Sequence, residues 1–165
     1  MRYGTRTHCK RRWTVQGERP VCNVKLGYDW AYLYVALCPF CGTMFAMFFS
    51  HLDKACFRQF MKEFEQHIAQ HHAGQKVLLV GDGATAHTAQ KWDEYEQIDW
   101  LKQPTACPEV NPVERFFQEL RRQTSNRVFA NKQEVEMLIE KLVEQYMEQP
   151  EKVRKLTLFP YIKSS

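Results

Sequence analysis

The chain has 165 residues and a formal net charge of +4, and 44% of its residues are hydrophobic and 25% charged. This length and balance are typical of one globular domain of about 100–200 residues, and they exclude a disordered or fibrous chain. The most apolar stretches, Tyr32 to Cys38 and Met44 to Phe49, are too short to cross a bilayer, and no apolar signal segment follows the basic N-terminus. We therefore expect a cytoplasmic protein with no membrane partner.

The six cysteines are scattered along the chain, and in the absence of an export signal we expect reduced thiols. Cys38 and Cys41 form the only Cys-x-x-Cys pair. A zinc site would need two further ligands, and the nearest candidates, Cys56, His71 and His72, lie on or after a predicted helix. A tight turn between two strands is the simpler interpretation of this pair, and a metal site is the alternative.

Basic residues gather in two zones on either side of a less charged middle. Residues 1–27 hold seven basic side chains against one acidic, and residues 115–132 hold five against one. Lysine and arginine bind phosphate backbones by displacing condensed counterions, although either zone could also be an ordinary solvated surface. The candidate DNA contacts in these zones are Arg11, Arg12, Arg115, Arg121 and Arg122.

The first predicted elements are two strands and a helix. Residues 28–37 alternate as in a strand covered on both faces, and residues 43–49 form a second strand after a turn that contains proline and glycine. Asp53 can cap a following helix that ends near His71. The apolar face of that helix consists of Phe57, Phe60, Met61, Phe64 and Ile68.

A short apolar run at residues 76–80 predicts a central strand, which ends in Gly81-Asp82-Gly83. A helix over residues 84–95 and a strand over 98–102 follow. Two further helices are expected, one from Pro112 to about Thr124 and one that starts near Asn131. This order predicts an α/β domain with a mixed sheet, and sheets of this kind bind ligands beyond the C-terminal ends of their strands.

Two carboxylates stand out for their positions in this pattern. Asp82 follows a buried strand and lies between two glycines, where a carboxylate can hold a metal ion, although it could also form a turn or cap a helix. Glu114 lies 32 positions later. Asn111 as N-cap, Pro112 at the first helical position and Glu114 at the third also fit a capping-box-like helix start, which would explain Glu114 without catalysis.

The sequence resembles the transposases of the mariner-like group and their bacterial insertion-sequence relatives, which have a ribonuclease H-like catalytic fold. The matching segments are Val80-Gly81-Asp82-Gly83-Ala84-Thr85-Ala86-His87 and Cys107-Pro108-Glu109-Val110-Asn111-Pro112-Val113-Glu114-Arg115-Phe116-Phe117, and Trp13 to Pro20 looks like the stretch between the family's first two strands. The resemblance covers nearly the whole chain. It implies a ribonuclease H-like mixed sheet flanked by helices.

By this resemblance, Asp82 and Glu114 are the second and third members of the family's acidic (DDE) triad, and both ligate Mg²⁺, for which Mn²⁺ can substitute. His87 and Asn111 would support them, although a lone histidine is more often a packed or surface residue. The implied partners are DNA, both transposon ends and target, and a second copy or a full-length transposase. The implied location is the bacterial cytoplasm, in association with the nucleoid.

The family's first acidic residue normally ends the first strand, just ahead of a segment like Met1-Arg2-Tyr3-Gly4. We therefore expect residues 1–165 to form one partial catalytic domain, with the first strand largely missing and no N-terminal helix-turn-helix. With two carboxylates, we expect weak binding of divalent metal and poor DNA cleavage by this chain alone. The alternatives are a non-catalytic DNA-binding or regulatory transposase fragment, and another nuclease of the same fold.

Overall fold

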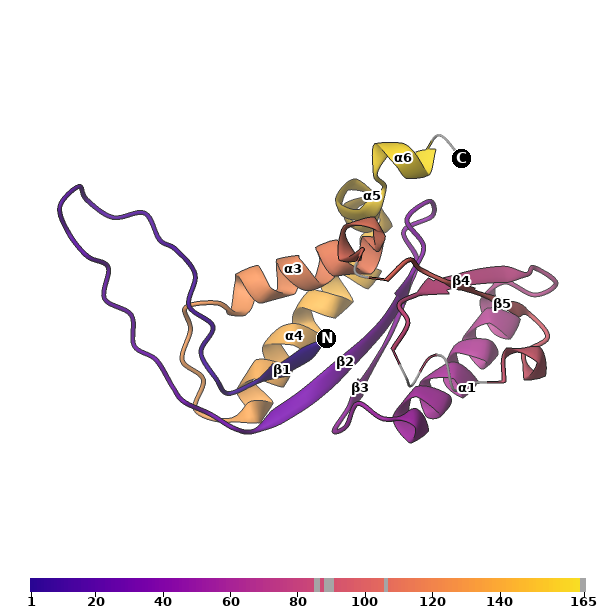
Figure 1. The fold of residues 1–165 in the computed structure, drawn as a ribbon, viewed down its shortest axis with the longest axis horizontal. Helices are drawn as coiled ribbons and strands as arrows, with labels where there is room; N and C mark the ends of the chain where they lie inside the picture. Colours follow the sequence, from indigo (N-terminus) through magenta and orange to yellow (C-terminus); the bar gives the residue numbers. More distant parts are fainter. Residues whose placement is uncertain (85–86, 88–90, 106, 164–165) are drawn as a thin grey trace.

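The computed structural model describes residues 1–84, 87, 91–105 and 107–163 (Figure 1). Its centre is an antiparallel sheet of β1 (Arg2–Gly4), β2 (Trp30–Leu37) and β3 (Met44–Phe49), in that order. A second, parallel sheet consists of β4 (Val77–Gly81) and β5 (Ile98–Lys102).

The α/β class and both kinds of strand pairing are as predicted, but the described strands form two hydrogen-bonded sheets in place of one mixed sheet. The three residues of β1 pair with β2, with Arg2 opposite Tyr32. Within the described residues, no strand pairs with the other edge of β1. The antiparallel and parallel parts are therefore not joined by backbone hydrogen bonds.

The two faces of β2 pack against different helices, as the alternation predicts. On one face, Leu33 is fully buried in a core with α3 (Pro112–Thr124), α4 (Lys132–Met147) and α5 (Pro150–Thr157). On the other face, Tyr34 and Ala36 pack against the buried side chains of α1 (Lys54–His71). Figure 1 shows α1 on one side of the sheet and α3 and α4 on the other.

The predicted helix starts are confirmed by their caps. Asp53 accepts a hydrogen bond from the backbone N–H of Cys56 at 2.8 Å, and Asn131 accepts one from Glu134 at 3.0 Å. The predicted helix over residues 84–95 falls largely on residues outside the described part of the chain; within it, a 3₁₀ helix spans Trp92–Glu94.

Three short elements were not predicted: the 3₁₀ helix Pro108–Val110, α5, and α6 (Pro160–Lys163). None of the described helices is long and apolar enough to cross a bilayer.

Residues 5–29 form a long arm between β1 and β2 that projects away from the sheet (Figure 1). Its two limbs are joined by a hydrogen bond from the Thr7 N–H to the Lys25 carbonyl at 3.0 Å. The backbone N–H of Lys10 donates a hydrogen bond to Oδ1 of Asn126 at 2.9 Å, and this joins the base of the arm to the loop after α3. The side chain of Trp13 near the tip is fully exposed.

Candidate active site

Asp82 directly follows β4, at the C-terminal end of the parallel strand pair. The side chain is 66% exposed, so a ligand can reach it. Gly81 is needed just before it, because a Cβ at that position would lie 2.5 Å from the indole of Trp100 on β5. The sequence prediction that Asp82 stands at a strand end is therefore confirmed.

His87 holds the carboxylate of Asp82 in place. Its Nδ1 lies 2.7 Å from Oδ1 of Asp82, and the same oxygen accepts a hydrogen bond from the Ala84 N–H at 3.1 Å. The imidazole rests on Phe57 of α1, with ring centroids 4.4 Å apart. The contacts of the Asp82 side chain with His87 and Ala84 thus involve one carboxylate oxygen, Oδ1. The Ala84 contact also makes Asp82 part of a local turn, so the structural and ligand-binding interpretations are compatible.

Glu114 lies in the first turn of α3, which Asn111 caps by accepting a hydrogen bond from the Val113 N–H at 3.2 Å. The predicted reciprocal contact of a capping box does not form. The Asn111 N–H donates instead to the carbonyl of Pro108, and Oε2 of Glu114 lies 3.6 Å from Nη1 of Arg121, two turns along the helix. The carboxylate of Glu114 is therefore directed along the helix surface by a charge partner, away from the cap.

Asp82 and Glu114 both exert an electrostatic effect on the start of β1. The amino group of Met1 is buried and donates a hydrogen bond to the carbonyl of Leu33. Burial, the largest cause, and the charge of Arg121 together lower the pKa of this amino group to about 5, and the charges of Glu114 and Asp82 oppose the shift. Both carboxylates thus act on one group, although they lie 32 positions apart in the sequence.

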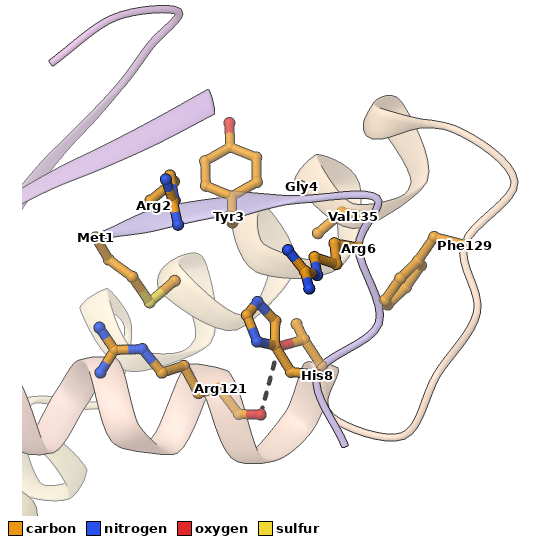
Figure 2. A pocket seen from close by; sticks show the side chains of 10 residues that line it. Met1, Arg2, Tyr3, Gly4, Arg6, His8, Arg121, Phe129 and Val135 are labelled. Carbon is orange, nitrogen blue, oxygen red and sulfur yellow. Dashed lines mark hydrogen bonds between the residues drawn. The ribbon is translucent and has the colours of Figure 1, made fainter. Parts of the chain in front are cut away.

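Arg121 also lines a cavity of about 240 Å³ between β1 and α3. Figure 2 shows its side chain extending toward Met1, while Arg6 and His8, from the first part of the arm, line the cavity on the other side. Burial lowers the pKa of His8, and Arg121 and Arg6 lower it further. The sequence places Arg6 in a basic zone and gives no indication of a role for His8. The proximity of both residues to α3 depends on the path of the arm, which the sequence does not show.

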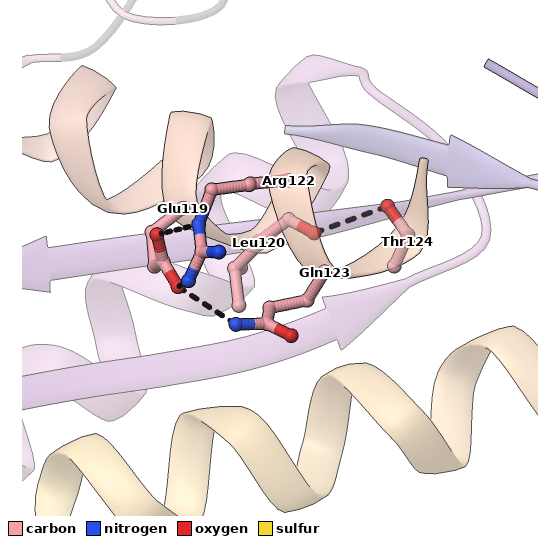
Figure 3. Close-up of polar contacts among 5 residues, drawn as sticks. All are labelled: Glu119, Leu120, Arg122, Gln123 and Thr124. Atoms are coloured by element: carbon pink, nitrogen blue, oxygen red, sulfur yellow. Dashed lines mark hydrogen bonds and ion pairs between the residues drawn. The ribbon is translucent and has the colours of Figure 1, made fainter. Parts of the chain in front are cut away.

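The remaining predicted arginines do not gather at this cavity. Arg122 forms a bidentate ion pair with Glu119: Nε donates to Oε2 at 2.7 Å and Nη2 donates to Oε1 at 2.6 Å (Figure 3). The guanidinium of Arg115 lies over the ring of Phe159, 5.3 Å from its centroid. Arg11 and Arg12 are exposed on the arm, where Arg12 donates to the carbonyl of Asn126 at 2.9 Å.

The carboxylate oxygens of Asp82 and Glu114 are of the chemical kind that hard divalent cations such as Mg²⁺ and Mn²⁺ prefer. Their number is small: in the described part of the chain, no group of three or more histidine, cysteine, aspartate or glutamate side chains is arranged to hold a metal ion. Glu114 would also have to exchange its contact with Arg121 for a metal. The two carboxylates therefore fit a metal as an incomplete ligand set.

A family described as DDE superfamily endonuclease matches residues 1–136, a span that contains Asp82, Glu114 and both sheets. The chain belongs to this family. Membership implies dependence on a divalent metal ion and confirms the relationship to DDE enzymes predicted from the sequence. A relative at the sequence level is an uncharacterized protein of Sinorhizobium fredii, y4pE/y4sA, which is 29% identical over 101 residues, 61% of this chain and 73% of the relative.

Solved structures of the Mos1 transposase have the same fold. A Mos1 mariner paired-end complex with Mn superposes with a TM-score of 0.69 at 12% identity, covering 99% of this chain and 53% of the transposase. The Mos1 strand transfer complex gives a TM-score of 0.68 at 14% identity, covering 94% of this chain and 48% of the transposase. The chain thus spans about half the length of these transposases. The predicted ribonuclease H-like fold is confirmed.

Proposed function

We propose that this chain is the catalytic part of a DNA transposase, in which Asp82 and Glu114 bind divalent metal. The observation that carries the proposal is the match of residues 1–136 to the DDE superfamily endonuclease family, in a fold that has Asp82 at the end of β4 and Glu114 in the first turn of α3. Carboxylates gathered at the end of a parallel strand form a site for hard cations. Family membership and the fold of the Mos1 complexes support DNA as the substrate.

The proposed metal ligands are the carboxylates of Asp82 and Glu114, and the proposed ion is Mg²⁺, with Mn²⁺ as a substitute. A bound divalent ion would activate the attacking oxygen and stabilise the leaving oxygen of a phosphodiester. Mn²⁺ is present in one of the matching Mos1 complexes, which supports this substitution.

The neighbouring side chains are proposed to position this pair. His87 contacts Oδ1 of Asp82 and so fixes the orientation of the carboxylate, whose side chain is 66% exposed. Asn111 fixes the first turn of α3 and with it the backbone of Glu114. Arg121 lies beside Glu114 and can contact a phosphate oxygen once Glu114 turns to the metal.

The incomplete ligand set leads us to expect weak metal binding and little DNA cleavage by this chain alone. By the family resemblance, a third carboxylate would complete the set just ahead of β1, near the Met1 amino group. Residues placed ahead of Met1 in a longer form of the polypeptide would enter this position.

Nicking of supercoiled plasmid in Mn²⁺ tests the proposal. The comparison needs this chain, a form extended ahead of Met1 in its native reading frame, and the Asp82→Asn and Glu114→Gln variants of the extended form. We expect the extended form to nick and each substitution to abolish nicking, because each removes a metal ligand. Glu109→Gln, in the 3₁₀ helix before α3, is a matched control that should keep activity.

Nicking that survives Asp82→Asn would contradict the proposed site. Strong nicking by this chain itself that depends on Asp82 would place a third ligand within residues 1–165.

A second candidate is a non-catalytic DNA-binding fragment that regulates a full-length transposase. The absence of a third ligand among the described residues favours it. It predicts DNA binding that is unaffected by Asp82→Asn and weakened by Arg121→Ala or by added salt. A filter-binding or fluorescence anisotropy titration with duplex DNA separates the two functions when it is read beside the nicking assay.

A further inference from the structure

The turn between β2 and β3 contains two thiols held in a tight loop. The Cys38 N–H donates to the Thr43 carbonyl at 2.9 Å, and the Gly42 N–H donates to the Cys38 carbonyl at 2.8 Å. Gly42 has a φ of 78°, a conformation that favours glycine. The turn is thus closed by backbone hydrogen bonds, and its shape does not depend on the thiols.

The backbone of this turn is also directed at a sulfur atom. The Cys41 N–H points at Sγ of Cys38, with a donor to acceptor distance of 3.4 Å. An N–H that donates to sulfur stabilises a thiolate, since it supplies positive charge to the anion. Sγ of Cys41 lies 3.0 Å from Oγ1 of Thr43, a second polar contact within the turn.

Cys41 is exposed and Cys38 is half-buried, so a metal ion can reach the thiol of Cys41 from solvent.

We propose that Cys38 and Cys41 are half of a four-thiolate zinc site that a second copy of this chain completes with the same two residues. Thiolates are ligands for Zn²⁺, and a structural zinc site needs four of them in a tetrahedral arrangement. In the described part of the chain no third histidine, cysteine or carboxylate joins the pair. A four-ligand zinc site at this turn would therefore need two further ligands from outside the described residues.

The surroundings of the turn favour a second copy. The turn projects from the end of the sheet next to α5 (Figure 1). Between the two cysteines lies Phe40, whose side chain is 55% exposed, and a facing copy would cover it. The turn is anchored at Gly42, where a Cβ would lie 2.2 Å from the Pro150 carbonyl, so it can present both thiols without moving. Two such turns related by a two-fold axis supply four sulfur ligands.

Assembly of this site involves no oxidation or reduction. Four S–H groups, two from each chain, lose their protons to the buffer, and four Zn–S bonds form. The product carries one Zn²⁺ per two chains. This stoichiometry distinguishes the proposed site from a site within one chain.

Titration with Co²⁺ under a phosphine reductant tests the proposal on the whole chain, because Co²⁺ substitutes for Zn²⁺ and gives a thiolate charge-transfer band in the near ultraviolet. We expect the band to saturate at one Co²⁺ per two chains, Zn²⁺ to displace it, and the mass measured by light scattering to double. Removal of the metal with a chelator should return the monomer.

Cys38→Ser and Cys41→Ser should each abolish the band and the metal-dependent dimer, whereas Cys9→Ser and Cys107→Ser, the matched controls, should keep both. Circular dichroism checks that the serine variants stay folded, and Phe40→Ser, which keeps both thiols, should weaken the dimer. A band that saturates at one metal per chain without dimerisation would overturn the proposal. So would the absence of a band, or a band that survives Cys41→Ser.

Discussion

His87 lies between the aromatic ring of Phe57 and the carboxylate of Asp82. The ring contact, at 4.4 Å between centroids, fixes the plane of the imidazole, and Nδ1 is 2.7 Å from Oδ1. Groups that orient a metal-binding carboxylate act on metal affinity through the geometry of that ligand. His87 is therefore a positioning residue in our account, and its effect should appear in metal binding as well as in activity.

We predict that His87→Ala lowers both Mn²⁺ affinity and Mn²⁺-dependent nicking of the extended form by roughly 10–100-fold, the range found for residues that orient metal ligands. His87→Gln can donate a hydrogen bond to Asp82 and should recover part of the loss. Isothermal titration with Mn²⁺ measures the affinity. An unchanged affinity in His87→Ala, with lower thermal stability, would assign His87 to packing alone.

The positions of Asp82, Glu114 and His87 could be predicted from the sequence, because a strand end, a helix start and a short spacing are local features. The partner of Glu114 could not. The capping-box pattern assigns its carboxylate to the cap at Asn111, and in the structure it faces Arg121. Sequence patterns give the backbone position, whereas the direction of a long side chain depends on which charges lie nearby in the folded molecule.

At the scale of elements, α3 carries the site and depends on its cap. Asn111 satisfies a backbone N–H that has no partner within the helix, and Phe116 and Leu120 anchor the opposite face in the core. The position of Glu114 thus rests on a local hydrogen bond and on packing against β2.

We predict that Asn111→Ala lowers the free energy of unfolding by about 1 kcal/mol, the usual effect of losing a side-chain N-cap, and that Asn111→Asp keeps the cap and most of the stability. Urea denaturation followed by circular dichroism measures the difference. Asn23→Ala on the exposed arm is the matched control, with an expected change near zero. Equal losses in the Asn111 and Asn23 variants would contradict a role for the cap.

The elements with a strong periodic pattern could be predicted closely, as for α1, whose predicted cap at Asp53 and end near His71 agree with the structure. The short helices could not. α5 has eight residues and buries only Val153 and Thr157, which is too few for a helical period to be recognised. The separation into two sheets depends on which strands pair across long stretches of sequence. The alternation of apolar and polar residues within one strand does not indicate which other strands it pairs with.

At the scale of the whole molecule, basic charge is presented in two ways. Arg11 on the arm is exposed, and within the described residues it forms no ion pair. Arg122 on α3 is also exposed, but it forms a bidentate ion pair with Glu119. A phosphate must displace that carboxylate before it can bind Arg122.

We therefore predict that Arg11→Gln weakens binding to duplex DNA and reduces the slope of log K against log salt by about 0.9, the contribution of one phosphate contact. Arg122→Gln, the matched control, should change the slope by much less, because its charge is already compensated. Anisotropy titrations at several salt concentrations give both slopes. A larger effect from Arg122 would show that the DNA lies along α3 and not along the arm.

The central claim is that Asp82 and Glu114, from two different elements, bind the same divalent metal. Fe²⁺ in place of Mg²⁺, with ascorbate and peroxide, generates radicals that cut the protein backbone next to the metal, and mass spectrometry locates the cuts. We predict cuts near residues 82 and 114 together, competition by Mg²⁺, and loss of both cuts in Asp82→Asn. Cuts near only one carboxylate, or cuts near Glu114 that persist in Asp82→Asn, would contradict a shared site.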